Sequence, residues 1–311
     1  MNLQLLIDQY IAHRQSLGEK QTSSGGHLRR FGRFIGTDVD IADVHPDQVN
    51  VFLAGTGPIT INWHVKLSVL RNFYRYAVSR EYVAMAPLPT VVPKRPPAFV
   101  PYIYSVEEIR RLLYTARSDD RHRVFTKPDV MHTIILLLYG TGLRVQELLD
   151  LDRADVNFAD STMMIRQSKF GKTRLVPFGP QLHQALQEYA KRHPAAPGEN
   201  AFFTTRYRRR VQKCSLQHNY RILCERADIR RTDGAHHQPR IHDLRHTFAV
   251  HRLISWYRQG ADVQKMLPFL SIYLGHVHIR ATQVYLSMTP ELLEEAGNRF
   301  EQYTTKEICH D

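Results

Sequence analysis

A proline-rich segment at residues 87–101 constrains the fold of this 311-residue chain more than any other sequence feature. Six of its fifteen residues are proline, with Lys94 and Arg95 between them. Proline fixes φ, lacks an N–H donor and cannot continue a helix, so the segment is predicted to be an extended linker. Two domains are therefore expected, residues 1–86 and residues 102–311, which agrees with the usual length of about 100 to 200 residues per domain.

The composition indicates a folded and basic protein. Apolar residues make up 43% of the chain, which is enough for real cores and excludes a disordered tail protein. With His neutral the net charge is +12, and Lys and Arg are in excess on both sides of the linker. Such a surface attracts polyanions, so nucleic acid is the first partner to consider.

Membrane insertion, secretion and disulfide bonding are not expected. No apolar run approaches the roughly 18 to 20 residues that cross a bilayer. The N-terminal sequence lacks the basic-then-apolar order of a secretory signal, so the protein is expected in the cytoplasm. Cys214, Cys224 and Cys309 are too few and too irregularly spaced for a disulfide framework, and no Cys-x-x-Cys pair suggests zinc, so all three are expected to be reduced.

Residues 1–86 are predicted to be helical. A first apolar stripe lies near the N-terminus, and the polar stretch 22–26 is expected to break it. A longer helix is predicted from about Thr60 to Arg80, with its cations on a solvated or a DNA-facing side. The stripe residues are Leu3, Leu6 and Tyr10, then Trp63, Leu67, Leu70, Phe73, Tyr74 and Ala77; the cations are Lys66, Arg71 and Arg75.

The part after the linker is predicted to begin with a helix. Ser105 and Glu108 form a capping box, and Tyr104 and Ile109 are placed for a hydrophobic staple. Pro128 can open a further helix that ends at Gly140.

A small sheet is expected next. Residues 162–167 and 174–178 have strand patterns on either side of a turn at 169–172. Helices resume at Gln181, and the pattern from Ala249 to the end is helical again. The predicted fold class is α+β and mostly helical, with a small antiparallel sheet in the second domain.

Several clusters carry side chains suited to chemistry, and each alone has an ordinary structural explanation. Arg144 and Glu147 follow a Gly-Thr-Gly turn at a predicted helix start, where a surface ion pair is common. Lys169 and Lys172 lie in the predicted hairpin turn, and lysine is common in exposed turns. Tyr285 follows the tripeptide Leu-Gly-His, but a single Tyr among fifteen is more often core or surface.

The segment 240–246, Arg-Ile-His-Asp-Leu-Arg-His, is the richest cluster. His242 and Arg245 would project from one helix face and bind one anion together. The same segment contains His-Asp-x-x-His, close to the zinc-protease pattern His-Glu-x-x-His. A zinc site on His242 and His246 lacks a third ligand at a usual spacing, and Arg245 would repel a divalent cation, so no metal is expected.

The order of these clusters resembles the tyrosine recombinase and phage integrase family: Arg, a hairpin Lys, His-x-x-Arg, Leu-Gly-His and then Tyr. The resemblance covers the whole chain and implies a helical core DNA-binding domain (1–86), an extended linker and a catalytic domain (102–311). It implies the catalytic residues Arg144, Lys169, His242, Arg245, His276 and Tyr285, with Glu147 in support. Lys172 is the alternative to Lys169, and the long segment between Arg245 and His276 is interpreted as a helix-loop insertion.

This set of residues suits attack on a DNA phosphodiester without a cofactor. Arg144 and Arg245 can each fork two N–H bonds onto phosphate oxygens and replace a metal ion. Tyr285 would be the nucleophile, with His242 as general base and His276 on a phosphate oxygen. Lys169 would protonate the departing 5′-oxygen, leaving a 3′-phosphotyrosyl enzyme. Tyr273 is the neighbouring alternative nucleophile, but its setting predicts packing.

The expected partner is double-stranded DNA, bound by a homotetramer in the cytoplasm, at the nucleoid. A C-terminal stripe is predicted to dock on a neighbouring subunit or on its own domain. A basic loop and the hairpin cations suit phosphate contacts, although a solvated surface would look the same. The stripe is Leu292, Leu293, Ala296 and Phe300, and the cations are Lys172, Arg174, Arg206, Arg208, Arg209 and Arg210. The alternatives are a type IB topoisomerase, a zinc-dependent hydrolase and a non-catalytic DNA-binding regulator.

Overall fold

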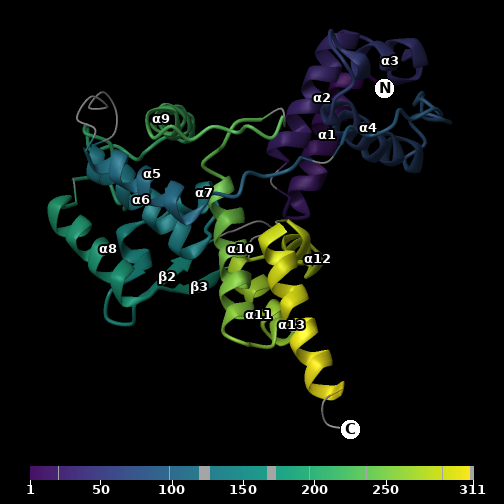
Figure 1. Ribbon diagram of the computed structural model, residues 1–311. Coiled ribbons are helices and arrows are strands. Elements are labelled where there is room, and N and C mark those ends of the chain that lie inside the picture. The colour runs from purple at the N-terminus through teal and green to yellow at the C-terminus, as the bar shows by residue number, and fades with distance from the viewer. Residues whose placement is uncertain are drawn as a thin grey trace. The chain divides into compact units, whose positions relative to one another are not determined.

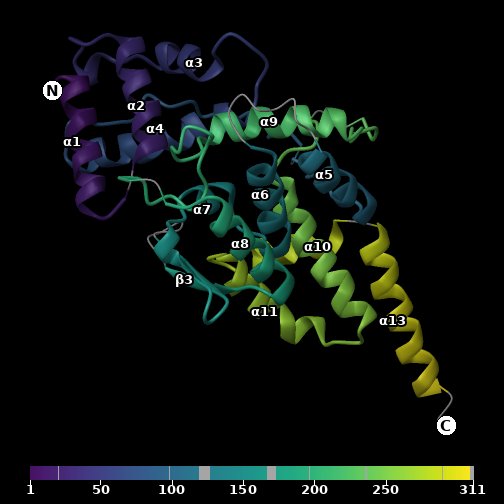
Figure 2. The ribbon, with the colours of Figure 1, turned by 90° about the vertical axis from the view of Figure 1, so that its left-hand side faces the viewer.

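The computed structural model describes residues 1–19, 21–97, 99–118, 127–166, 173–195, 197–234, 237–288 and 290–308. The chain forms two compact units, Met1–Phe99 and Val100–Asp311 (Figures 1 and 2). The boundary between them falls within the proline-rich segment, whose described residues form neither helix nor strand.

The first unit is helical. Thr60 caps the N-terminus of α4, where its side chain accepts a hydrogen bond from the backbone N–H of Asn62. The predicted helix over 60–80 is therefore confirmed, and all six residues of its apolar stripe are buried. The elements are α1 (Leu3–Ser16), α2 (Thr22–Ile35), η1 (Ile41–Asp43), α3 (Pro46–Ala54) and α4 (Ile61–Ser79).

The break predicted at residues 22–26 is wrong, because these residues lie within α2. A Cβ added at Gly25 would lie 3.3 Å from Ile11 Cδ1, and one at Gly32 would lie 2.6 Å from Gln4 Oε1. The glycines of α2 therefore allow it to pack closely against α1, and this contact outweighs their low helix propensity. The chain breaks earlier, after Ser16.

The second unit begins as predicted. The backbone N–H of Ser105 donates to Glu108 Oε2 at 2.8 Å, and the N–H of Glu108 donates to Ser105 Oγ at 3.1 Å. The helices that follow are α5 (Val106–Ser118), α6 (Pro128–Thr141), α7 (Val145–Leu149), α8 (Pro180–Arg192), α9 (Lys213–Arg226), α10 (Asp243–Arg258), α11 (Val263–Leu274), α12 (Arg280–Gln283) and α13 (Pro290–Ile308). Short 3₁₀ turns are η3 (Arg153–Asp155) and η5 (Val284–Ser287).

The sheet has three antiparallel strands in the order β1 (Val156–Asn157), β2 (Thr162–Ile165) and β3 (Arg174–Pro177). Met163 pairs with Val176, and both side chains are buried in the core. The two predicted strands are confirmed, whereas the two-residue β1 has no sequence pattern of its own. The predicted turn at 169–172, with Lys169 and Lys172, lies outside the described residues.

Helix α10 is central to the second unit. It packs against α6, α11 and α13 (Figures 1 and 2). It begins at Asp243, six residues before the predicted helical stretch from Ala249. The segment between Arg245 and His276 consists of the rest of α10, a turn and α11, so it is helical for most of its length.

The four residues of the predicted C-terminal stripe all lie on α13, but their burial differs. Leu292 is buried in the cluster formed by α10 and α11, whereas Leu293 is exposed. The side chain of Phe300 lies outside the described residues. The second unit thus combines many helices with one small antiparallel sheet, and the predicted mostly helical α+β class is confirmed.

Candidate active site

Two glycine turns bring distant parts of the second unit together. Gly142 ends α6 with φ +63°, and Gly275 ends α11 with φ +68°. A Cβ at Gly142 would lie 2.8 Å from Leu274 Cδ2, and one at Gly275 would lie 2.8 Å from Arg174 Nη1. Both positions therefore need glycine, for the left-handed backbone and for the close approach.

Arg245 lies at the start of α10, and its buried side chain connects the two glycine turns. Its Nη1 donates to the Gly142 carbonyl and its Nη2 to the Leu274 carbonyl, each at 2.7 Å. The residue is only 3% exposed, and burial, together with the charge of Arg144, lowers its pKa to about 10. The guanidinium therefore stays charged near neutral pH, and two of its five N–H donors hold the backbone. The guanidinium also hydrogen-bonds Tyr285, and its remaining donors can bind an anion beside that phenol.

Arg144 and Glu147 form the N-terminal cap of α7. The backbone N–H of Arg144 donates to Glu147 Oε2 at 3.0 Å, and Arg144 Nη1 donates to Oε1 at 2.7 Å. Arg144 Nη2 also donates to the Gly275 carbonyl at 2.9 Å. The Arg–Glu pair is thus a structural part of the site, and the ordinary interpretation as a surface ion pair is wrong.

Arg174 completes this cluster from β3. Its Nη1 and Nη2 donate to the two carboxylate oxygens of Glu147 at 3.0 and 2.8 Å, and its Nε donates to the Tyr273 carbonyl at 3.0 Å. Burial alone would raise the pKa of Glu147, but the hydrogen bonds and charge of Arg174, with those of Arg144, lower it to about 2. Glu147 is therefore ionised and orients both arginines.

The DNA contact predicted for Arg174 stays a prediction, but the structure shows a second role for this residue. Its side chain is only 12% exposed and is held by Glu147, so Arg174 supports the site from within. No local sequence signal indicates this role, because Arg174 and Glu147 are 27 residues apart.

Tyr285 lies in η5 and is 3% exposed. Its ring is stacked on that of His276, with centroids 6.2 Å apart and planes at 22°, and it contacts His246 at 5.6 Å and 58°. His246 in turn contacts His242 edge-to-face at 5.3 Å and 89°. Three imidazoles and the phenol therefore form one continuous group.

The site keeps these imidazoles neutral. Burial lowers the pKa of His242 to about 4, with a smaller contribution from His246 and Arg245. Burial and the charges of Arg245 and Arg144 lower that of His276 to about 4, and its Nδ1 lies 2.7 Å from Thr282 Oγ1. Burial raises the pKa of Tyr285, while the charge and a hydrogen bond of Arg245 oppose this shift.

The structure thus brings five of the six predicted catalytic residues into one site, and Lys169, like its alternative Lys172, lies outside the described residues. The sequence pattern indicates His246 only as a candidate zinc ligand. It lies four residues after His242, and this helical spacing could have indicated that both side chains face one site. Among the described residues, no group of three or more His, Cys, Asp and Glu side chains could hold a metal ion.

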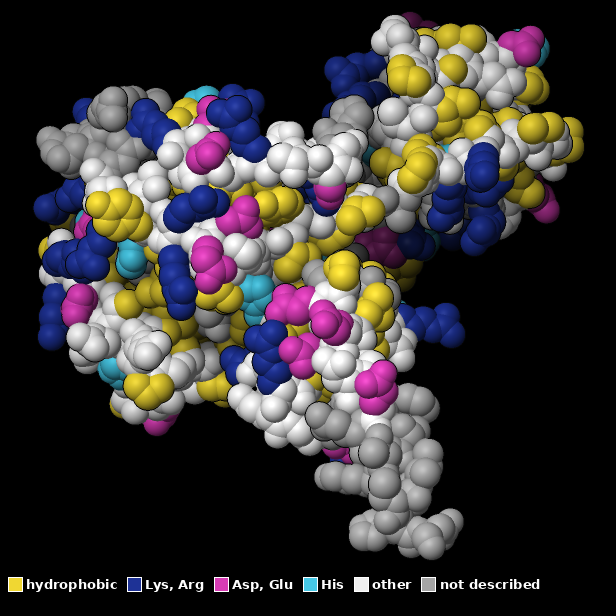
Figure 3. Space-filling model, in the orientation of Figure 1, with side chains coloured by type: hydrophobic (Ala, Val, Ile, Leu, Met, Phe, Trp, Pro, Cys, Tyr) yellow, Lys and Arg dark blue, Asp and Glu magenta, His cyan; other side chains and the backbone are white. Residues whose placement is uncertain are grey.

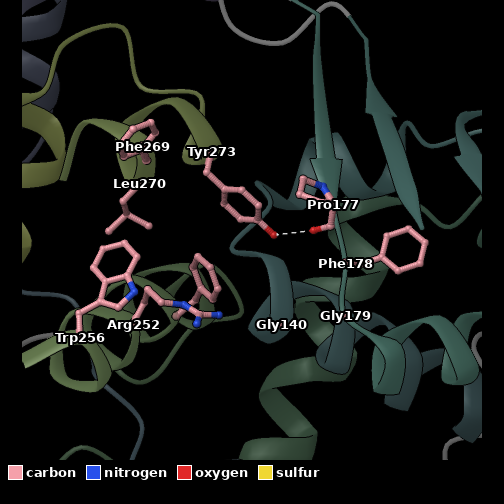
Figure 4. A pocket seen from close by; sticks show the side chains of 10 residues that line it. Gly140, Pro177, Phe178, Gly179, Arg252, Trp256, Phe269, Leu270 and Tyr273 are labelled. Atoms are coloured by element: carbon pink, nitrogen blue, oxygen red, sulfur yellow. Dashed lines mark hydrogen bonds between the residues drawn. The ribbon is translucent and has the colours of Figure 1, made fainter. Parts of the chain in front are cut away.

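Tyr273 is placed differently from Tyr285. Its hydroxyl donates to the Pro177 carbonyl at 3.1 Å, and its ring stacks on that of Phe248 at 5.8 Å and 26°. It points into an apolar pocket of about 400 Å³, lined also by Trp256, Phe269 and Leu270 (Figure 4). Burial raises its pKa to about 12. Its predicted packing role is confirmed, because it links α11 to β3.

A basic cavity of about 640 Å³ adjoins the site. Arg144 and His242 line it together with Lys213, Arg221 and Arg240. On the face drawn in Figure 3, acidic side chains gather where α13 begins, and Lys and Arg side chains are spread over the rest of the unit. The cavity has the size and charge to take part of a phosphodiester backbone.

The basic loop predicted to contact phosphates divides into two kinds of residue. Arg206, Arg208 and Arg209 are exposed, and the Arg206 guanidinium lies 4.7 Å from the centre of the Tyr207 ring. Arg210 instead donates to the Leu149 carbonyl at 2.7 Å and pairs with Asp152. The Arg210 guanidinium therefore anchors the loop to the end of α7, and its predicted phosphate contact stays a prediction.

Two further expectations concern cysteine and the membrane. Cys214 and Cys224 are free thiols, the first exposed and the second buried, and Cys309 lies outside the described residues. Among the described helices, none has the length and apolar character that crossing a membrane requires.

Comparisons with known proteins agree with this arrangement. Residues 104–291 match the model of the phage integrase family. The chain is 36% identical over 303 residues to a protein of Sinorhizobium fredii named as a candidate integrase/recombinase, and the match covers 95% of this chain and 96% of that one. It is 27% identical to the tyrosine recombinase XerC of Pediococcus pentosaceus, over 96% of this chain and 98% of that one.

A solved structure shares the fold. The integrase of the transposon Tn1549 superposes with a TM-score of 0.70 at 16% identity, covering 97% of this chain and 99% of that one. The family match spans most of the second unit, and the relative from Sinorhizobium fredii spans nearly the whole chain. The chain therefore belongs to the phage integrase family of tyrosine recombinases.

Proposed function

We propose that this protein is a site-specific DNA recombinase that cuts and rejoins DNA through a 3′-phosphotyrosyl intermediate on Tyr285. The observation that carries the proposal is the buried phenol of Tyr285 beside Arg245, surrounded by neutral imidazoles. A phenol has a reference pKa of about 10, so it needs both a positive field and a proton acceptor to attack near neutral pH.

Arg144 and Arg245 bind the scissile phosphate. Each retains N–H donors beyond those that hold the backbone and Glu147, and both remain charged while the phosphorane gains charge. His276 hydrogen-bonds a phosphate oxygen through its Nε2, because its Nδ1 is engaged with Thr282. The arginines supply the stabilisation, so no cofactor enters the reaction.

The chemical step forms a bond between Tyr285 Oη and phosphorus and breaks the bond from phosphorus to the 5′-oxygen. The phenolic proton passes to a neutral imidazole, a role that the sequence assigns to His242, and Lys169 donates a proton to the departing 5′-oxygen. The phosphotyrosine conserves the bond energy, so a 5′-hydroxyl from another duplex reverses the step without ATP.

Double-stranded DNA is the substrate, and residues 1–86 form the core DNA-binding domain, with Arg71 and Arg75 exposed on α4 for phosphate contacts. Exchange between two duplexes requires four active sites, so the working form is a homotetramer acting at the nucleoid in the cytoplasm. Support comes from solved structures of the same fold, which include a lambda integrase tetramer bound to a Holliday junction and a Tn1549 integrase bound to transposon end DNA.

The relatives compared above are integrases and recombinases, which favours recombination over the topoisomerase and zinc-hydrolase alternatives. Cleavage should accordingly persist in excess EDTA. Complete loss of cleavage that zinc alone restores would favour a hydrolase on His242 and His246.

The test is a suicide duplex that spans the DNA flanking the gene and is nicked beside the cut site. The parent protein should become covalently attached, and peptide mapping should place the 3′-phosphate on Tyr285. Tyr285→Phe should bind the duplex and trap nothing, whereas the matched variant Tyr273→Phe should trap it. Trapping by Tyr285→Phe would overturn the assignment.

A further inference from the structure

His246 is the imidazole that lies between the other groups of the site. Its ring contacts that of Tyr285 at 5.6 Å and that of His242 at 5.3 Å. His242, by contrast, contacts His246 and lines the basic cavity with Arg144. Of these two imidazoles at the start of α10, His246 is therefore the one in ring contact with the phenol, and His242 is the one that opens onto the basic cavity.

The Nδ1 atom of His246 is buried and has no hydrogen-bond partner within the part of the chain that the structure describes. Buried polar atoms in folded proteins almost always have a partner, and a catalytic role is one of the recognised reasons for an exception at a reactive site. Since imidazole has one donor and one acceptor nitrogen when neutral, His246 can present a lone pair to a nearby hydroxyl.

The surroundings of His246 hold it in the proton-accepting form. Burial lowers its pKa; Asp243, on its own helix, acts in the opposite direction, while Arg245 and Arg240 lower the pKa further. The other titratable groups in ring contact with it are His242 and Tyr285. Near neutral pH the ring is uncharged, as a general base must be before it acts.

We propose that His246, rather than His242, accepts the phenolic proton as Tyr285 attacks the phosphate, which makes His246 a further catalytic residue of the reaction proposed above. In this step the O–H bond of Tyr285 breaks as an N–H bond forms on His246. The bond from Tyr285 Oη to phosphorus forms as the bond to the 5′-oxygen breaks, and that oxygen takes its proton from Lys169. On rejoining, the imidazolium of His246 returns the proton to the phenol. His242 is left to hydrogen-bond a phosphate oxygen beside Arg144.

The test measures the single-turnover rate of covalent attachment between pH 6 and pH 10, with the suicide duplex above. His246→Gln keeps a similar polar shape but cannot accept a proton. Its rate near neutral pH should fall by a factor on the order of 10² to 10⁴, the usual contribution of a general base. The deficit should shrink as pH rises toward the phenol pKa, because hydroxide then removes the proton.

His242→Gln is the matched variant, at the N-cap of the same helix. The rate deficit of His242→Gln should stay constant across the pH range, because a phosphate contact does not depend on ionisation of the phenol. A substrate with sulfur in place of the 5′-bridging oxygen needs no proton for its leaving group, so it should rescue a Lys169→Ala variant and leave the His246→Gln deficit unchanged. Added imidazole should restore part of the activity of His246→Ala.

Three results would overturn the proposal: parental rates in His246→Gln, a deficit that is constant across the pH range, or a deficit that shrinks at high pH in His242→Gln instead. Thermal unfolding and duplex affinity of each variant separate a folding defect from a chemical one, and imidazole rescue of His246→Ala decides the case if His246→Gln is unstable. If the parent protein itself traps no DNA, the proposed function fails; if the parent traps DNA and His246→Gln does so equally fast, only this inference fails.

Discussion

Glu147 receives both Nη groups of Arg174, one on each carboxylate oxygen, at 3.0 and 2.8 Å. This bidentate pair connects α7 with β3, and Arg144 donates to the same carboxylate from the other side. One buried anion therefore fixes two cations, one of which is proposed to bind the scissile phosphate. The pair has consequences for stability, for catalysis and for the dependence of both on pH.

Replacement of Glu147 by Gln should destabilise the second unit. The folded-state pKa of about 2, set against the reference value of 4.5, corresponds to about 3 kcal/mol of stability. Because the folded pKa is lowered, this contribution is fully present above pH 4.5 and is lost as the pH falls toward 2. Urea unfolding at pH 7 and pH 3 should show a difference between parent and Glu147→Gln that shrinks at the lower pH. An equal difference at both pH values would contradict the assignment.

Arg174→Lys should lower cleavage while leaving DNA affinity intact. Lysine keeps the charge but cannot form the two parallel bonds to Glu147 or the bond to the Tyr273 carbonyl. Single-turnover cleavage should fall by roughly 10- to 100-fold, as expected for a support residue. The salt dependence of DNA binding should stay that of the parent; a slope reduced by about 1 would instead show a phosphate contact.

Much of this arrangement follows from sequence, but the Glu147–Arg174 pair does not. Cap, turn and periodicity rules depend on near neighbours, which is why the capping box at Ser105 and the helix over 60–80 are confirmed. Arg174 meets Glu147 only when β3 and α7 pack together, so local rules predict only a basic residue at a strand end that suits a phosphate contact. The same limit explains Arg210, whose partners belong to the end of α7 and the loop after it.

Packing between helices also explains why the helix break predicted in the first unit is wrong. A run of Ser and Gly predicts a break by propensity, yet at residues 22–26 glycine is needed for close contact with α1. His246 illustrates a related limit at the site. Its spacing from His242 suggested a metal pair, whereas the ring contact with Tyr285 depends on η5, far along the chain.

Arg245→Lys should reduce cleavage by orders of magnitude with DNA binding largely kept. Lysine has no fork to hold the Gly142 and Leu274 carbonyls while also binding a phosphate. Arg144→Lys should behave similarly, since it loses the bonds to Glu147 and Gly275. Duplex affinity measured alongside covalent trapping checks both variants. Near-parental trapping by Arg245→Lys would remove this residue from the proposed reaction.

DNA binding through the first unit should depend strongly on salt, with log K falling by roughly 0.9 per phosphate neutralised for each unit of log salt concentration. The double variant Arg71→Ala, Arg75→Ala removes two exposed cations of α4 and should reduce the magnitude of that slope by about 1 to 2. Lys265→Ala is the matched control, because it removes an exposed cation already paired with Asp262 at 3.4 Å, and its slope should equal that of the parent. The slopes can be measured by fluorescence anisotropy with a labelled duplex between 50 and 200 mM salt. Over this range the affinity of a protein that makes about 6 to 10 phosphate contacts changes by about 10³ to 10⁵. A double variant with the parental slope would show that this face of α4 is solvated and that the first unit contacts DNA elsewhere.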